Sequence, residues 1–147
     1  MTIFLVGYMG CGKSTIGKKL AYNLKHDFID LDTYIEEQEG RTIKEIFADD
    51  GEDYFRKLER VYLHRVIDTE NVVISVGGGT PCFFDNMEQM NEYGLTVYIN
   101  MHPKALIPRL QLSGRKYGVK PLSTSLMKGL FIFIILSLTS ASLFLHH

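Results

Sequence analysis

Cysteine is scarce in this sequence. Its 147 residues include two cysteines, Cys11 and Cys82, which are too few for a disulfide framework and lack the spacing of metal ligands. An excess of basic residues is also missing, because 16 lysines and arginines face 17 aspartates and glutamates. The resulting net charge of −1 argues against a nucleic-acid-binding protein. The two cysteines fit a reducing cytosol, and we expect a cytoplasmic monomer. The N-terminus has no basic region and no small-residue cleavage site, so we expect no signal peptide.

Charge is nearly absent from the C-terminal part of the chain. After Lys120 the only lysine, arginine, aspartate or glutamate is Lys128, and residues 129–145 form an uncharged run rich in leucine, isoleucine and phenylalanine. The preceding part has the composition of a soluble protein, long enough to bury roughly two thirds of its unfolded surface. We therefore predict a globular domain over residues 1–122 and an atypical hydrophobic tail over residues 123–147.

Short apolar runs alternate with amphipathic segments through most of the chain. Continuous apolar runs are typical of parallel strands buried on both faces, whereas apolar residues at intervals of three and four indicate helices. The alternation predicts an α/β fold of three layers, with a mostly parallel central sheet between helices. The predicted strands are Ile3–Val6, Phe28–Leu31, Val72–Val76 and Thr96–Ile99. The predicted helices are Lys13–Leu24, Thr33–Glu39, Thr42–Phe47, Glu52–Ile67, Met87–Tyr93 and Lys104–Leu112.

Three residues suited to ligand binding each follow a predicted strand, namely Gly7, Asp32 and Gly77. Right-handed crossovers place the carboxyl ends of parallel strands along one edge of a sheet. Ligands of open α/β sheets bind at that edge. We therefore expect these three positions to converge on a ligand site.

The first of these positions opens a phosphate-binding motif. Residues Gly7–Ser14 match the pattern G-x-x-x-x-G-K-[ST] between a predicted strand and a predicted helix. The glycines allow backbone N–H groups to surround phosphate oxygens, and the N-terminus of the helix adds its positive dipole end. In this motif the lysine reaches the β- and γ-phosphates and the serine hydroxyl is a ligand for Mg²⁺. The predicted ATP-binding residues here are Gly10, Cys11, Gly12, Lys13, Ser14 and Thr15.

The residues after the second and third predicted strands allow two interpretations each. Asp32 could hold a substrate hydroxyl, but Asp30 and Asp32 could equally be turn or helix N-cap residues. Arg56 lies three residues before Glu59 on a helix, which suits either a guanidinium oriented for a carboxylate ligand or a solvated ion pair. The turn Gly77–Gly79 favours close approach of a ligand, or simply a tight exit from the strand.

Six segments of the chain form an ordered set: Gly7–Thr15, Asp30–Asp32, Gly40–Phe47, Gly51–Glu52, Phe55–Glu59 and Val73–Gly79. In their order and spacing, these segments resemble the shikimate kinase family. The resemblance implies the fold of nucleoside monophosphate kinases, with a helical substrate-binding insert over residues 33–61 and a lid loop over residues 113–122. It implies transfer of the γ-phosphate of ATP to the 3-hydroxyl of shikimate, in the route to chorismate and the aromatic amino acids.

The resemblance also assigns roles to particular residues. It implies that Lys13 and Asp32 are catalytic, with Asp32 orienting and deprotonating the attacking hydroxyl. It implies that Asp30 contacts Mg²⁺ through water, beside Ser14. Arg56 would bind the carboxylate of shikimate, and the glycines Gly77, Gly78 and Gly79 would line the substrate. Where the family has a lid arginine before Pro-Leu, this chain has Lys120, and the nearby Arg115 is an alternative lid cation.

The resemblance ends near Leu122. The family continues with charged helices and a further arginine for the substrate carboxylate, whereas residues 123–147 contain no arginine. Three explanations stay open: a replaced or out-of-frame C-terminus, a membrane anchor, or a hydrophobic strand or helix of the core. Only the second implies membrane contact. A chain with this tail is expected to bind and phosphorylate shikimate poorly.

Two other functions remain compatible with the sequence. One is phosphorylation of a different small metabolite by the same fold, as in a gluconate kinase. The other is nucleotide binding without catalysis. The glycine turn Gly77–Gly79 and the pair Arg56–Glu59 favour shikimate over gluconate.

Overall fold

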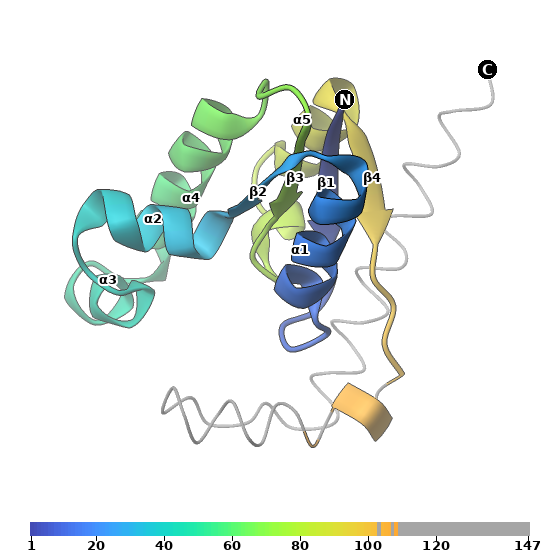
Figure 1. The fold of residues 1–147 in the computed structure, drawn as a ribbon. Coiled ribbons are helices and arrows are strands. Elements are labelled where there is room, and N and C mark those ends of the chain that lie inside the picture. Colours follow the sequence, from blue (N-terminus) through green and yellow to red (C-terminus); the bar gives the residue numbers. More distant parts are fainter. Residues whose placement is uncertain (103, 107, 109–147) are drawn as a thin grey trace. The chain divides into compact units, whose positions relative to one another are not determined.

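The computed structural model describes residues 1–102, 104–106 and 108. Within residues 1–102 a four-stranded sheet lies between helices, as Figure 1 shows. The strands are β1 (Thr2–Val6), β2 (Asp27–Asp30), β3 (Val72–Ser75) and β4 (Leu95–Tyr98). The helices are α1 (Lys13–Leu24), α2 (Leu31–Glu39), α3 (Ile43–Asp49), α4 (Glu52–Val66), the short 3₁₀ helix η1 (Thr80–Cys82) and α5 (Asn86–Tyr93).

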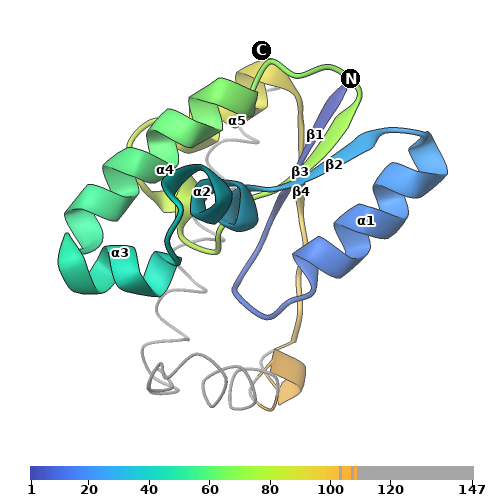
Figure 2. The ribbon, with the colours of Figure 1, turned by 60° about the vertical axis from the view of Figure 1, so that its left-hand side comes forward.

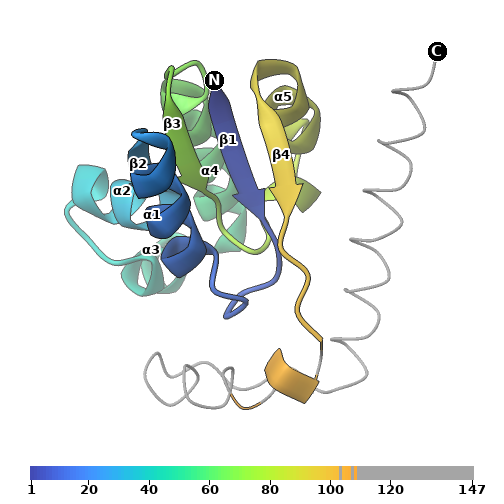
Figure 3. The ribbon, with the colours of Figure 1, turned by 45° about the vertical axis from the view of Figure 1, so that its right-hand side comes forward.

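All strand pairs of this sheet are parallel, in the order β2-β3-β1-β4. Phe4 in the central β1 pairs with Ile74 of β3 and Thr96 of β4. Viewed as in Figure 3, α1 lies in front of the sheet, whereas α4 and α5 lie behind it. The predicted α/β fold with a mostly parallel central sheet in three layers is therefore confirmed.

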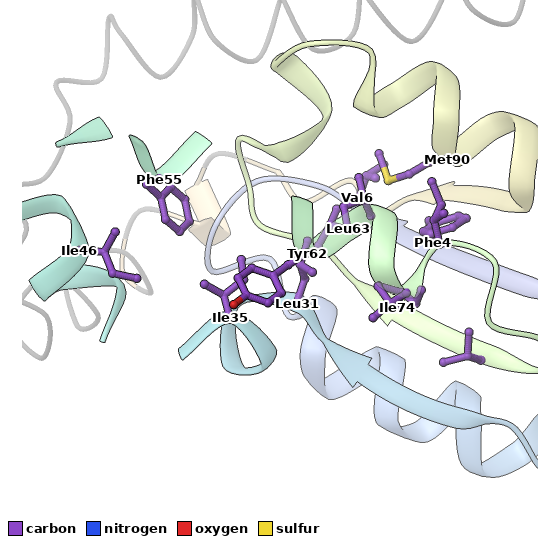
Figure 4. Close-up of a cluster of buried hydrophobic side chains, with 14 residues drawn as sticks. Phe4, Val6, Leu31, Ile35, Ile46, Phe55, Tyr62, Leu63, Ile74 and Met90 are labelled. Carbon is purple, nitrogen blue, oxygen red and sulfur yellow. The ribbon is translucent and has the colours of Figure 1, made fainter. Parts of the chain in front are cut away.

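Alternate side chains of β1 enter two separate hydrophobic clusters. Ile3 and Leu5 pack with Ala21 of α1, whereas Phe4 and Val6 pack in the larger cluster that includes α4 and α5 (Figure 4). Successive strand residues point to opposite faces, and both faces here are covered. This double coverage is the reason that Ile3–Val6 of β1 is a continuous apolar run.

Helices α2 and α3 lie beside α4, on the opposite side of the sheet from α1 (Figure 2). Ile35 of α2 and Ile46 of α3 are fully buried in the same cluster as Phe55 of α4. The turn between α2 and α3 is sharply defined, because Gly40 adopts a left-handed φ of 67° and ends α2. Thr42 then begins α3 with a reciprocal capping box.

The predicted elements of residues 1–99 are all present, and no end is shifted by more than two residues. The main shift occurs where β2 ends at Asp30 and α2 begins at once, because the Asp30 side chain accepts a hydrogen bond from the Thr33 N–H and caps the helix. Of the predicted helix Lys104–Leu112, residues 104–106 and 108 are described, and they are helical. The predicted lid over residues 113–122 and the tail over residues 123–147 lie outside the described residues.

Among the residues that the structure describes, no helix has both the length and the apolarity needed to cross a bilayer.

Candidate active site

The loop between β1 and α1 has the backbone of an anion cradle. Gly10 and Gly12 adopt left-handed φ values of 77° and 91°, which glycine accommodates without steric cost. A side chain at Gly7 would lie 2.7 Å from the carbonyl oxygen of Ile99, so this position also requires glycine. Gly12 is the N-cap of α1 and offers no side-chain acceptor, so the first N–H groups of the helix remain available to an anion.

Lys13 turns back over this loop. Its ammonium Nζ donates hydrogen bonds to the carbonyl oxygens of Gly7, at 2.7 Å, and Tyr8, at 3.0 Å. The residue is buried, and burial lowers the pKa of its ammonium group. A cation held at the mouth of a ring of N–H groups suits a polyphosphate, whose oxygens can replace the loop carbonyls as acceptors.

Ser14 and Asp30 are in direct contact. The Ser14 hydroxyl donates a hydrogen bond to one oxygen of the Asp30 carboxylate, whose other oxygen caps α2. Asp30 is therefore the helix cap that one interpretation of the sequence required, and it also lies beside the predicted metal ligand. A hydroxyl and a carboxylate are hard oxygen donors of the kind that Mg²⁺ prefers, so these two residues fit that ion.

Asp32 and Glu59 approach the same point on the glycine turn. The position that a β-carbon would take at Gly77 lies 3.1 Å from Asp32 Oδ1, 2.9 Å from Glu59 Oε1 and 3.0 Å from Thr80 Oγ1. Burial, with the negative charges of Glu59 and Asp30 adding to it, raises the pKa of the Asp32 carboxyl to about 7. Burial also raises the pKa of Glu59, which accepts a hydrogen bond from the Thr80 hydroxyl.

Arg56 is held by two carboxylates of its own helix. Its Nε and Nη2 donate to Glu52 Oε1 at 3.2 and 3.0 Å, and its Nη1 donates to Glu59 Oε2 at 3.2 Å. A guanidinium group has five N–H donors. Among the described residues, one N–H on each terminal nitrogen has no acceptor, which leaves a pair of donors for a ligand.

The glycine turn after β3 touches both the arginine and the phosphate loop. The β-carbon position at Gly79 lies 2.9 and 3.0 Å from the two terminal nitrogens of Arg56, so Gly79 faces the guanidinium group between them. The β-carbon position at Gly78 lies 2.9 Å from the backbone nitrogen of Met9. A side chain at Gly78 or Gly79 would displace one of these groups. The glycine turn therefore lies against both the arginine that suits a carboxylate and the loop that suits a phosphate.

The structure thus brings the predicted residues of the phosphate loop, the two aspartates, Arg56 and the glycine turn to one edge of the sheet. Within the loop, Cys11 is buried, with its Sγ 3.9 Å from Lys13 Nζ, whereas Thr15 is exposed. The predicted lid cations Lys120 and Arg115 lie outside the described residues. Sequence reasoning missed two contributors: Glu52, whose spacing of four residues from Arg56 was a usable signal, and Thr80, for which the sequence carries none.

Comparison with known proteins agrees with this geometry. The family model for shikimate kinase matches residues 9–131. Shikimate kinase from Bacteroides thetaiotaomicron is 57% identical over 111 residues, which are 76% of this chain and 63% of that protein. The crystal structure of shikimate kinase from the same organism gives a TM-score of 0.74 at 47% identity, covering 97% of this chain and 80% of that one. Shikimate kinase from Acinetobacter baumannii in complex with shikimate gives 0.68 at 27% identity, covering 91% and 92%.

The chain spans slightly less than two thirds of the length of the curated relatives it matches, 63% for the one from Bacteroides thetaiotaomicron. The match nevertheless includes the phosphate loop from Met9 onward, α2 to α4 and the glycine turn. The resemblance drawn from the sequence is therefore confirmed, and the chain belongs to the shikimate kinase family.

Proposed function

We propose that this chain transfers the γ-phosphate of ATP to the 3-hydroxyl of shikimate. The observation that carries the proposal is the placement of Arg56, whose guanidinium group keeps two donors without an acceptor among the described residues and lies against the glycine turn that also contacts the phosphate loop. Shikimate has one carboxylate, and a planar guanidinium group binds carboxylates with two parallel hydrogen bonds. The solved relative with bound shikimate supports this choice of substrate.

Asp32 is the proposed acceptor for the proton of the attacking hydroxyl. A carboxyl group with a pKa of about 7 is ionised to a large extent at neutral pH, yet is far more basic than an ordinary aspartate. It lies beside Gly77, on the same edge as the phosphate loop. A hydroxyl placed between Asp32 and the γ-phosphate would be oriented for attack, and orientation is most of what phosphoryl transfer requires.

Lys13 and the N–H groups of the loop are the proposed binding groups for the phosphates of ATP. Mg²⁺ would be held by Ser14, and by Asp30 through water, and would neutralise charge on the transferring phosphate. No cluster of three histidine, cysteine, aspartate or glutamate side chains suits a metal among the residues that the structure describes. Binding of Mg²⁺ would therefore depend on the nucleotide oxygens and water. The cytoplasmic location and monomeric state expected from the sequence remain predictions.

The test is a coupled ADP-release assay on the purified full chain with MgATP and, separately, shikimate, gluconate or no acceptor. We expect release that depends on shikimate, with the product phosphorylated at the 3-hydroxyl by ³¹P and ¹H NMR. Arg56→Ala should raise KM for shikimate and leave KM for ATP unchanged, because the substrate carboxylate loses its partner. Release that depends on gluconate would support the alternative kinase, and ATP binding without ADP release would support the non-catalytic module.

A further inference from the structure

Residues 83–85, which follow η1, contact two successive turns of α4. The Arg56 Cζ lies 4.2 Å from the ring centroid of Phe83, and the Arg60 Cζ lies 5.3 Å from that of Phe84. Arg60 also forms an ion pair with Asp85 at 2.8 Å. Phe83 and Phe84 therefore pack on two arginines that lie one helical turn apart. Of the two arginines, Arg56 is the one that faces Gly79.

The contacts of Arg56 differ in how far they are exposed to competition from solvent. Glu52 is exposed, with 55% of its side-chain surface accessible, so its hydrogen bonds to Arg56 compete with solvent. The Arg56 side chain itself is only 16% accessible. Phe83 is partly buried, and a partly desolvated aromatic ring attracts a guanidinium group more strongly than an exposed one does.

Hydrogen bonds along the edge of a guanidinium group do not by themselves fix the orientation of its plane. A ring packed on the group restricts both rotation of the plane and the rotamers of the arginine stem. We propose that Phe83 is a positioning residue that orients Arg56 for the substrate carboxylate. The inference rests on the proposed function for the identity of that carboxylate, whereas the restriction of Arg56 can be measured without any substrate.

The physical consequence is a preorganised clamp. An arginine that is already oriented loses less rotamer freedom when a ligand binds. The entropic cost of binding is therefore lower, and the affinity for the ligand is higher. Removing the ring should therefore weaken binding of the carboxylate and leave the chemical step unchanged, because the ring packs on Arg56 and the proposed proton acceptor is Asp32. This pattern separates a positioning residue from a catalytic one.

The experiment compares Phe83→Leu, Phe83→Tyr and the matched control Phe84→Leu in the full chain. Phe83→Leu should raise KM for shikimate about tenfold, with kcat and KM for ATP within about twofold, and tenfold corresponds to about 1.4 kcal/mol. Phe83→Tyr keeps the aromatic face and should restore the parental KM. Phe84→Leu removes the ring over Arg60 and should leave KM for shikimate, kcat and KM for ATP unchanged. A parental KM in Phe83→Leu, or an equal rise in Phe84→Leu, would overturn the inference.

A second measurement separates this inference from the proposed function. In chains carrying ¹⁵N-arginine, rotation about the Cζ–Nε bond of Arg56 is followed by NMR without substrate, with Arg56→Lys used to assign the signal. Rotation should be faster in Phe83→Leu and unchanged in Phe84→Leu. If the parental chain fails to phosphorylate shikimate but this difference is seen, the proposed function fails and the positioning role stands. Equal rotation in the parent and Phe83→Leu contradicts the positioning role whatever the substrate.

Discussion

The carboxylates of Asp32, in α2, and Glu59, in α4, converge on Gly77, with oxygens 3.1 and 2.9 Å from the position that a β-carbon would take there. Two negative charges so close to each other, in a buried place, disfavour ionisation. Burial is the main cause of the pKa of about 7 at Asp32, and the repulsion from Glu59 adds to it. The same pair predicts how stability and activity depend on pH.

Asp32 should make the folded chain less stable as pH rises. The folded state holds this proton up to about pH 7, whereas an ordinary aspartate releases it near 3.8. Between these values the folded state binds more protons than the unfolded state, so stability falls with rising pH. We expect the free energy of unfolding of Asp32→Asn to exceed that of the parent by about 4 kcal/mol at pH 8 and to match it at pH 4, because each pH unit between the two pKa values contributes about 1.4 kcal/mol.

Urea denaturation at both pH values measures this difference. Asp68→Asn, a change at an exposed position near the end of α4, is the control and should not reproduce the gain in stability of Asp32→Asn at pH 8. An Asp32→Asn variant that is no more stable than the parent at pH 8 would contradict the raised pKa.

Activity should depend on the same proton in the opposite sense. If Asp32 accepts the proton of the attacking hydroxyl, only its ionised form is active, so kcat/KM should fall about tenfold per pH unit below pH 7. Asp32→Asn should lower kcat by a factor of about 10² to 10⁴ and abolish this limb of the profile. The role of Asp32 as proton acceptor is tested by a profile of kcat/KM between pH 5 and 9. A flat profile in the parent, together with an undiminished kcat in Asp32→Asn, would rule this role out.

Gly79→Ala should impair substrate binding while leaving the fold intact. The new methyl group would meet the terminal nitrogens of Arg56 at 2.9 and 3.0 Å, and this flexible side chain can move away. Loss of a charge-assisted pair of hydrogen bonds should raise KM for shikimate by about tenfold to a hundredfold. KM for ATP should be unchanged, and circular dichroism should report a folded protein.

Gly78→Ala provides the contrast, because its methyl group would meet the backbone nitrogen of Met9 at 2.9 Å and displace the phosphate loop. In this variant KM for ATP should rise. If both variants alter the same constant, the division of the glycine turn between arginine and loop is wrong.

Lys13→Met should abolish tight binding of MgATP. The methionine keeps most of the length of the side chain but removes the ammonium group that lies at the loop, so affinity should fall by about two orders of magnitude. Stability should change little, because a cation whose pKa burial already lowers is replaced by an apolar group. Calorimetric titration with MgATP measures the affinity, with Lys19→Met, on the exposed face of α1, as the control. An unchanged affinity in Lys13→Met would remove the basis of the nucleotide site.

Much of this protein is determined locally by its sequence. The strand Thr2–Val6, the glycines of the phosphate loop and the helix Lys13–Leu24 follow from residue types over short spans, because buried strands, left-handed turns and helix starts depend on neighbours in the chain. Arg56 and Glu59 were predicted as neighbours for the same reason, since they lie three positions apart on one helix.

Other properties depend on residues far apart in the chain, and only the tertiary structure decides them. The raised pKa of Asp32 comes from its burial and from Glu59, which α4 brings to the end of β3. The orientation of Arg56 involves Phe83, 27 positions further along the chain, whose ring reaches it because η1 turns back onto α4. Electrostatic and packing energies depend on distance in space, and no spacing pattern encodes a contact that two separate elements create when they pack together.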